Sequence, residues 1–127
     1  MEPVAIVLTL ALLEYFAFGV LVGRARGQYG VEAPATTGHP IFERYHRVHQ
    51  NTLEQLAIFI PAAWMFGVFV SPAGAALLGL VFIAGRIVYL RGYVEDPKKR
   101  STGTFITLFA QAVLLLGGGV GALLAWL

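Results

Sequence analysis

The sequence contains no cysteine, and charged residues are scarce. The absence of cysteine excludes a disulfide framework, a thiolate metal site and a cysteine nucleophile. Only 13% of the 127 residues are charged, about half the ~25% that is typical of soluble domains. Hydrophobic residues make up 57%, and the mean hydropathy is +0.73. This balance indicates an integral membrane protein.

Long apolar runs predict four membrane-spanning helices. The first ten residues have no basic segment of the kind that opens a cleaved signal peptide, so we expect them to begin the first span. The runs are too long for strands and do not alternate with a period of two. We therefore predict an all-α, integral membrane four-helix bundle that forms one domain over residues 1–127. Its spans cover about residues 3–23, 41–70, 72–93 and 104–127.

The basic residues are distributed on one side of these spans. The second connection, around Ser71, carries no charge, whereas connections 1 and 3 and the adjoining helix ends hold all nine basic residues. By the positive-inside rule, loops 1 and 3 are cytoplasmic and both termini lie outside. The short, loop-poor chain suggests a bacterial inner membrane. The nine residues are Arg24, Arg26, Arg44, Arg47, Arg86, Arg91, Lys98, Lys99 and Arg100.

The second span begins with an unusually polar segment, Phe42–Glu54. The uncharged part that follows, Leu56–Val70, has only 15 residues, too few to cross a bilayer that needs about 20. Part of the polar segment must therefore lie at membrane depth, where ionisable residues usually mark a functional site. In a helix, Arg47, Asn51 and Glu54 form one stripe.

A second polar stripe is predicted on the third span, where Arg86, Tyr89 and Tyr93 are spaced by three and four residues. Arg100 follows in the third connection. If the two stripes face each other, they enclose guanidinium, carboxylate, amide and phenol groups. Such a set suits a small zwitterionic ligand with more carboxylates than amines.

Other interpretations of the polar residues remain open. Arg47 and Glu54 could simply pair with each other. His46 and His49 have a spacing that a metal could use, but no third ligand is apparent, so we predict no metal site. A transporter or channel would need a polar path through the outer half of the spans, which is almost entirely apolar. We expect no nucleic-acid binding, because the basic Lys98–Arg100 cluster lies on a membrane loop.

Two further polar residues lie inside spans. Glu14 cannot face lipid cheaply, so we expect it to point into the bundle or a subunit interface, in a structural role. We expect Gln111 to form a hydrogen bond between helices.

The sequence resembles the MAPEG family, the membrane-associated proteins in eicosanoid and glutathione metabolism, over nearly its whole length. The family's second-helix signature, E-R-x-x-R-x-[HQ]-x-N-x-x-E, is matched within Phe42–Glu54. Gly85–Tyr93 resembles the third-helix motif, and Thr36–Gly38 sits where several members carry the same tripeptide. Arg100-Ser101 falls where members place an arginine at the start of the fourth helix. His49 is typical of the microsomal glutathione transferase branch, whereas Gln55 and Gly27 depart from the leukotriene synthase pattern.

The resemblance implies a homotrimer that binds glutathione between neighbouring subunits near the cytoplasmic face. It further implies that the glutathione site is lined by Arg47, His49, Asn51, Glu54, Arg86, Tyr89, Tyr93 and Arg100, with either Arg24 or Arg26 reaching it from the end of the first span.

The implied chemistry is activation of the glutathione thiol for attack on a lipophilic substrate that arrives from the bilayer. A guanidinium favours a thiolate, and the first candidate for this catalytic role is Arg100, with Tyr93 as a hydrogen-bond donor. The electrophile would be a carbon compound, for detoxification, or a lipid hydroperoxide in a glutathione-dependent peroxidase reaction. The alternative is a non-catalytic membrane scaffold that binds lipid or glutathione.

Overall fold

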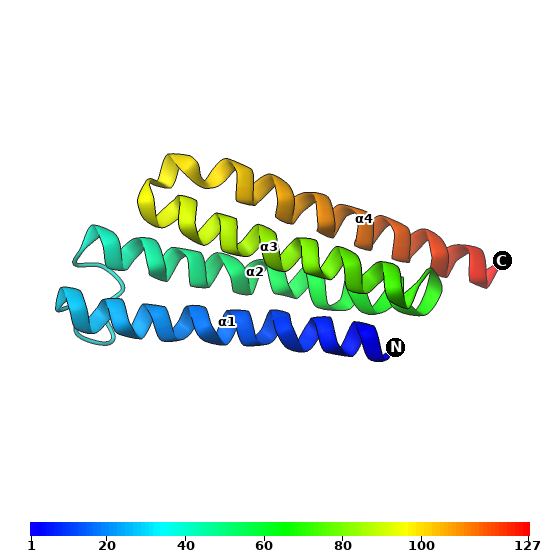
Figure 1. Ribbon diagram of the computed structural model, residues 1–127, viewed down its shortest axis with the longest axis horizontal. Coiled ribbons are helices and arrows are strands. Elements are labelled where there is room, and N and C mark those ends of the chain that lie inside the picture. The colour runs from blue at the N-terminus through cyan, green and yellow to red at the C-terminus, as the bar shows by residue number, and fades with distance from the viewer.

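The computed structural model describes all residues, 1–127, as four long helices with no strand. They are α1 (Glu2–Tyr29), α2 (Pro40–Phe69), α3 (Pro72–Glu95) and α4 (Ser101–Trp126), with the short 3₁₀ helix η1 (Pro97–Arg100) before α4. The helices lie side by side as an up-down-up-down bundle (Figure 1). Each is long and apolar enough to cross a membrane. The predicted four-helix membrane bundle is confirmed.

The helix ends follow local sequence signals. Ser71 Oγ accepts a hydrogen bond from the Gly74 N–H at 2.9 Å, and Pro72 occupies the first turn of α3. His39 caps α2 in the same way, through Nδ1 and the Ile41 N–H. α1 ends at Gly30, whose φ of 67° is left-handed and suits glycine. α1 therefore continues through Arg24–Tyr29, beyond the predicted span, and the first loop is correspondingly shorter.

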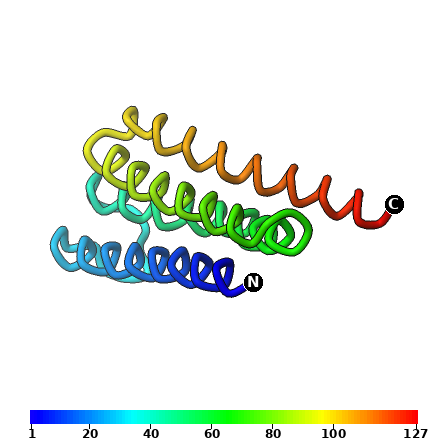
Figure 2. The backbone as a smooth tube through the Cα atoms, turned by 45° about the vertical axis from the view of Figure 1, so that its right-hand side comes forward, coloured from blue at the N-terminus to red at the C-terminus, as the bar shows by residue number.

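The two ends of the bundle differ in polarity. The C-terminal ends of α1 and α3 lie with the N-terminal ends of α2 and α4, whereas both chain termini lie at the other end (Figures 1 and 2). This arrangement gathers the basic connections at one end, which we call the basic end.

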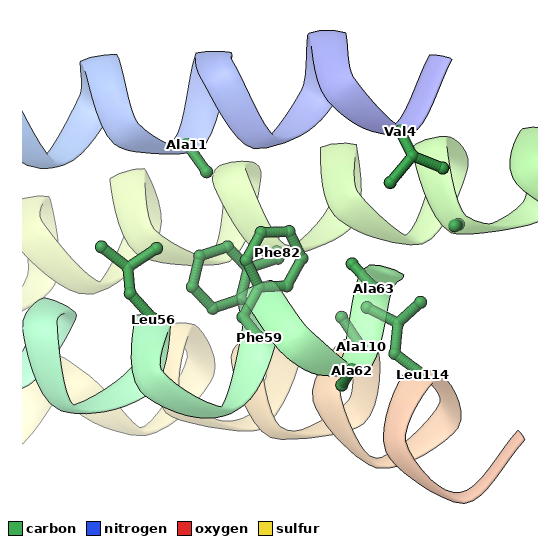
Figure 3. Close-up of a cluster of buried hydrophobic side chains, with 10 residues drawn as sticks. Val4, Ala11, Leu56, Phe59, Ala62, Ala63, Phe82, Ala110 and Leu114 are labelled. Atoms are coloured by element: carbon green, nitrogen blue, oxygen red, sulfur yellow. The ribbon is translucent and has the colours of Figure 1, made fainter. Parts of the chain in front are cut away.

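The main core lies toward the middle of the bundle and is built from small and aromatic side chains (Figure 3). Phe59 of α2 stacks on Phe82 of α3 with ring centroids 4.0 Å apart. Many large apolar side chains remain exposed on the outer surface, for example Phe16, Phe105 and Leu116. In water this surface would be costly, but it suits lipid. The bundle thus has an apolar part, which suits the bilayer, and a basic end, where the polar residues lie.

Candidate functional site

A polar cavity of about 420 Å³ opens among α2, α3 and α4 at the basic end. Its size falls within the range of small-molecule sites. Helix α1 contributes no residue to it. The cavity is lined by Arg47, Asn51 and Gln55 from α2, Arg86, Tyr89 and Tyr93 from α3, Arg100 from η1, and Thr104, Thr107 and Leu108 from α4. The two stripes described above therefore do face each other.

Arg86 lies in the wall of this cavity, is only 1% exposed and forms hydrogen bonds to both α2 and α4. Its Nη2 donates to Asn51 Oδ1 at 2.7 Å and to Thr52 Oγ1 at 3.1 Å. Its Nε also donates to Thr52 Oγ1, at 3.3 Å, and its Nη1 donates to Thr107 Oγ1 at 3.4 Å. A buried guanidinium stays charged, so these bonds hold a permanent positive charge beside the cavity.

The wall of α3 is aromatic. The Arg86 guanidinium lies 4.2 Å from the centroid of the Tyr89 ring, and Tyr89 stacks on Tyr93 at 5.6 Å. Gly103 of α4 packs directly on the backbone of Tyr89, where no side chain would fit. The close approach of α3 and α4 fixes the position of this wall relative to the start of α4.

Two arginines occupy the more exposed part of the site. Arg47 Nη1 pairs with Glu54 Oε1 at 3.2 Å, and both side chains are about half exposed, at 52% and 55%. An ion pair this exposed contributes little stability, so Arg47 can exchange it for a ligand carboxylate at low cost. Arg100 is exposed and donates to the Pro97 carbonyl at 2.8 Å; no carboxylate pairs with it.

Several predicted site residues lie elsewhere in the subunit. Glu54 does not line the cavity but reaches it through Arg47. His49 points toward α1, where its ring stacks on Tyr15 at 4.4 Å. Arg24 lines a separate cavity of about 170 Å³ beside Gln28 and Tyr45.

Arg26 has a different set of partners. It donates to the Ala35 carbonyl at 2.7 Å and to the Val31 carbonyl at 3.4 Å. Its guanidinium also lies over the Phe42 ring. It therefore holds the first loop against α2.

Sequence reasoning missed part of the cavity wall: Gln55, Thr104, Thr107 and Leu108. Helical spacing carried a signal for them. Gln55 continues the row of Arg47 and Asn51 at four-residue intervals, and Thr104 follows Arg100 at the same interval. Gln55, Thr104 and Thr107 are uncharged and Leu108 is apolar, so none of them marks a site inside a span as an ionisable residue does.

The two polar residues predicted inside the spans are both directed into the bundle. Gln111 Nε2 donates to the side-chain and backbone oxygens of Gln55, which confirms the predicted bond between helices. The carboxylate oxygens of Glu14 are buried and have no hydrogen-bond partner. Glu14 therefore belongs to the bundle interior and not to the cavity.

Comparison with known proteins adds an independent finding. The sequence model of the MAPEG family matches residues 4–120. The chain is 44% identical to human microsomal glutathione S-transferase 2, over 92% of this chain and 80% of that protein. It is 34% identical to leukotriene C4 synthase of Cavia porcellus, over 96% and 83% of the two chains. An uncharacterized protein of Synechocystis sp. is 45% identical over 89% and 82%.

Proposed function

Because this chain belongs to the MAPEG family and is an integral, multi-pass membrane protein, we propose that it is a membrane-bound glutathione transferase. In this proposal it conjugates glutathione to lipophilic electrophiles, with glutathione-dependent peroxidase activity as a second reaction of the same site. The observation that carries the proposal is the cavity of α2, α3 and α4, in which three arginines meet two amides and two phenols. The two animal relatives, a microsomal glutathione S-transferase and a leukotriene C4 synthase by name, support the same class of reaction.

The cavity suits glutathione by charge and by hydrogen bonding. Glutathione carries two carboxylates, one ammonium group and a thiol. Arg47 and Arg100 offer forked donors to the carboxylates, Glu54 offers an acceptor to the ammonium group, and Asn51 both donates and accepts. Arg86 is already bonded to Asn51, so it positions that amide and adds positive charge.

Arg100 and Tyr93 are the proposed catalytic residues. A free thiol has a pKa of about 8.5, and a nearby guanidinium favours the thiolate. Arg100 suits this role because it lines the cavity and has no carboxylate partner. Tyr93 would donate a hydrogen bond to the sulfur. The thiolate then attacks an electrophilic carbon, or the outer oxygen of a hydroperoxide, in which case a second glutathione completes the reduction.

We also propose that three copies assemble, so that glutathione binds between subunits. This would give a role to Arg24, Arg26 and His49, which lie away from the cavity of their own subunit and would reach that of a neighbour. Residues 1–127 act as one domain in this proposal. Loops 1 and 3 face the cytoplasm, both termini lie outside, and lipophilic substrates enter from the bilayer, which we propose to be a bacterial inner membrane.

The test is turnover by the purified protein in detergent. Wild type, Arg100→Ala and Arg91→Ala are compared for thiolate absorbance of bound glutathione and for conjugation of an aromatic halide. Arg91 is the matched control, because it is exposed on α3 at the same end but does not line the cavity. We expect a loss of about a hundredfold to a thousandfold in kcat for Arg100→Ala, the range for one electrostatic catalytic group.

The other outcomes separate the alternatives. Absence of glutathione binding by the wild type would refute the proposal. Binding without turnover would favour the non-catalytic scaffold. Equal turnover in Arg100→Ala and Arg91→Ala would remove Arg100 from the catalytic role and leave the binding site intact.

A further inference from the structure

The side chain of Gln55 lies at the deep end of the cavity, and a contact with Gln111 fixes the orientation of its amide group. Gln111 of α4 is buried, and its Nε2 donates twice to Gln55 of α2. One acceptor is the Gln55 backbone oxygen at 3.3 Å, and the other is Gln55 Oε1 at 2.9 Å. Both hydrogens of that nitrogen are therefore used.

This pair of bonds determines which end of the Gln55 amide faces the cavity. A flipped Gln111 would place its oxygen against the Gln55 carbonyl, where no hydrogen lies between the two acceptors. Gln111 Nε2 must therefore point at Gln55, and the Gln55 side chain must accept this bond with Oε1. The Gln55 amide nitrogen is left with no partner in the subunit. It is not among the fully buried unpaired atoms, and Gln55 lines the cavity, so its two donors are open to the cavity.

Gln55 also stands at a boundary along the helix axis. It lies two turns beyond Arg47, about 12 Å deeper into the bundle. After Gln55, α2 has no amide, hydroxyl or charged side chain to its end, and α4 has none after Gln111. The neighbouring cavity wall includes the apolar Leu108. Gln55 thus carries the last unpaired amide donor of the cavity wall before the apolar half of the bundle.

We propose that Gln55 determines the specificity for the second substrate, by donating a hydrogen bond from Nε2 to an oxygen of a lipophilic acceptor. This inference rests on the proposed transferase function. Among electrophiles, it selects α,β-unsaturated carbonyl compounds over alkyl and benzyl halides, because the carbonyl compounds develop negative charge on an oxygen whereas the halides place it on the departing halide. A fixed donor aimed at that charge lowers the barrier for that class alone.

The step balances without a further reactant. The thiolate sulfur forms a bond to the β-carbon, and the electron pair of the carbon–carbon double bond moves to give an enolate. The enolate oxygen accepts the hydrogen bond from Gln55. A proton from water then adds to the α-carbon, and the product is a saturated carbonyl thioether.

The experiment compares trans-2-nonenal with benzyl chloride, which carries no oxygen. The measured quantity is the ratio of kcat/KM for the two acceptors, in which changes in glutathione binding or thiolate formation cancel. Gln55→Met keeps the length of the side chain and removes the donor. Gln50→Met, on an exposed position of the same helix, is the matched control. We expect the ratio to fall about tenfold or more in Gln55→Met and to stay unchanged in Gln50→Met.

A second variant separates loss of the donor from a folding defect. Gln55→Glu keeps an acceptor for Gln111 and lacks the donor, so the ratio should fall in it as well. An unchanged ratio in both Gln55 variants, with wild-type turnover of both acceptors, would overturn this inference and leave the proposed function standing. Absence of wild-type turnover with either acceptor would instead refute the proposed function and this inference with it.

Discussion

Gly103 lies where α4 packs directly against the backbone of α3. A Cβ added there would overlap the Cα and N of Tyr89 and lie 2.7 Å from Tyr89 Cβ. Carbon atoms in ordinary contact are about 3.5–4.0 Å apart, so the two helices would have to separate by roughly 1 Å. No rotamer change can relieve the overlap, because two of the three atoms belong to the backbone.

The magnitude follows from the packing. Overfilling a tight contact usually costs about 1–3 kcal/mol, and an overlap with rigid backbone belongs at or above the upper end. We expect Gly103→Ala to lower the free energy of unfolding by about 3 kcal/mol or more. Because Tyr89 lines the cavity, the same displacement should weaken glutathione binding.

The measurement is thermal unfolding of the purified protein in detergent, followed by helical circular dichroism. Gly119→Ala is the matched control, since it makes the same change in the same helix where a Cβ would meet nothing within 4 Å. It should be neutral or stabilise by up to about 1 kcal/mol, the usual gain of alanine over glycine in a helix. If the two variants unfold at the same temperature, the direct backbone contact of α3 and α4 is refuted.

Two further predictions test the buried polar groups. Thr52→Val keeps the shape of a fully buried side chain and leaves two N–H groups of Arg86 unpaired, so it should cost about 1–3 kcal/mol. Thr52→Ser, which keeps the acceptor, should cost clearly less in the same unfolding assay, and an equal loss would contradict the role of the hydroxyl. Glu14→Met removes a carboxylate with no hydrogen-bond partner and should raise the unfolding temperature, with a gain of about 1–3 kcal/mol. A lower unfolding temperature would show that Glu14 has a stabilising partner.

The sequence predicted the helices well because lipid leaves few alternatives. A chain that crosses a bilayer must satisfy its own backbone hydrogen bonds, so a long apolar run is almost necessarily a helix. Helical spacing then placed Arg47 and Asn51 on one face and Arg86 and Tyr89 on another. That these faces meet could be expected from the short second connection, which makes α2 and α3 antiparallel neighbours.

The rest of the site depended on information that the spacing did not carry. His49 belongs to the same signature as Asn51 but is two residues away, about 200° around the helix, and so it contacts α1. Arg24 and Arg26 lie on α1, away from the cavity of their own chain, and only the proposed assembly of several copies would bring them to one. Gln55 was overlooked because its donor becomes free only through the bond from Gln111, a contact 56 residues away in sequence.

Arg44, near the start of α2, makes its contacts with the end of α3. Its Nη1 donates to the carbonyls of Val94 at 2.9 Å and Glu95 at 3.1 Å, which are left unpaired at a helix C-terminus. The contact joins the start of α2 to the end of α3, so it forms only when both ends of this hairpin emerge on the same side of the bilayer. A hairpin with only one end on that side of the bilayer cannot make this bond.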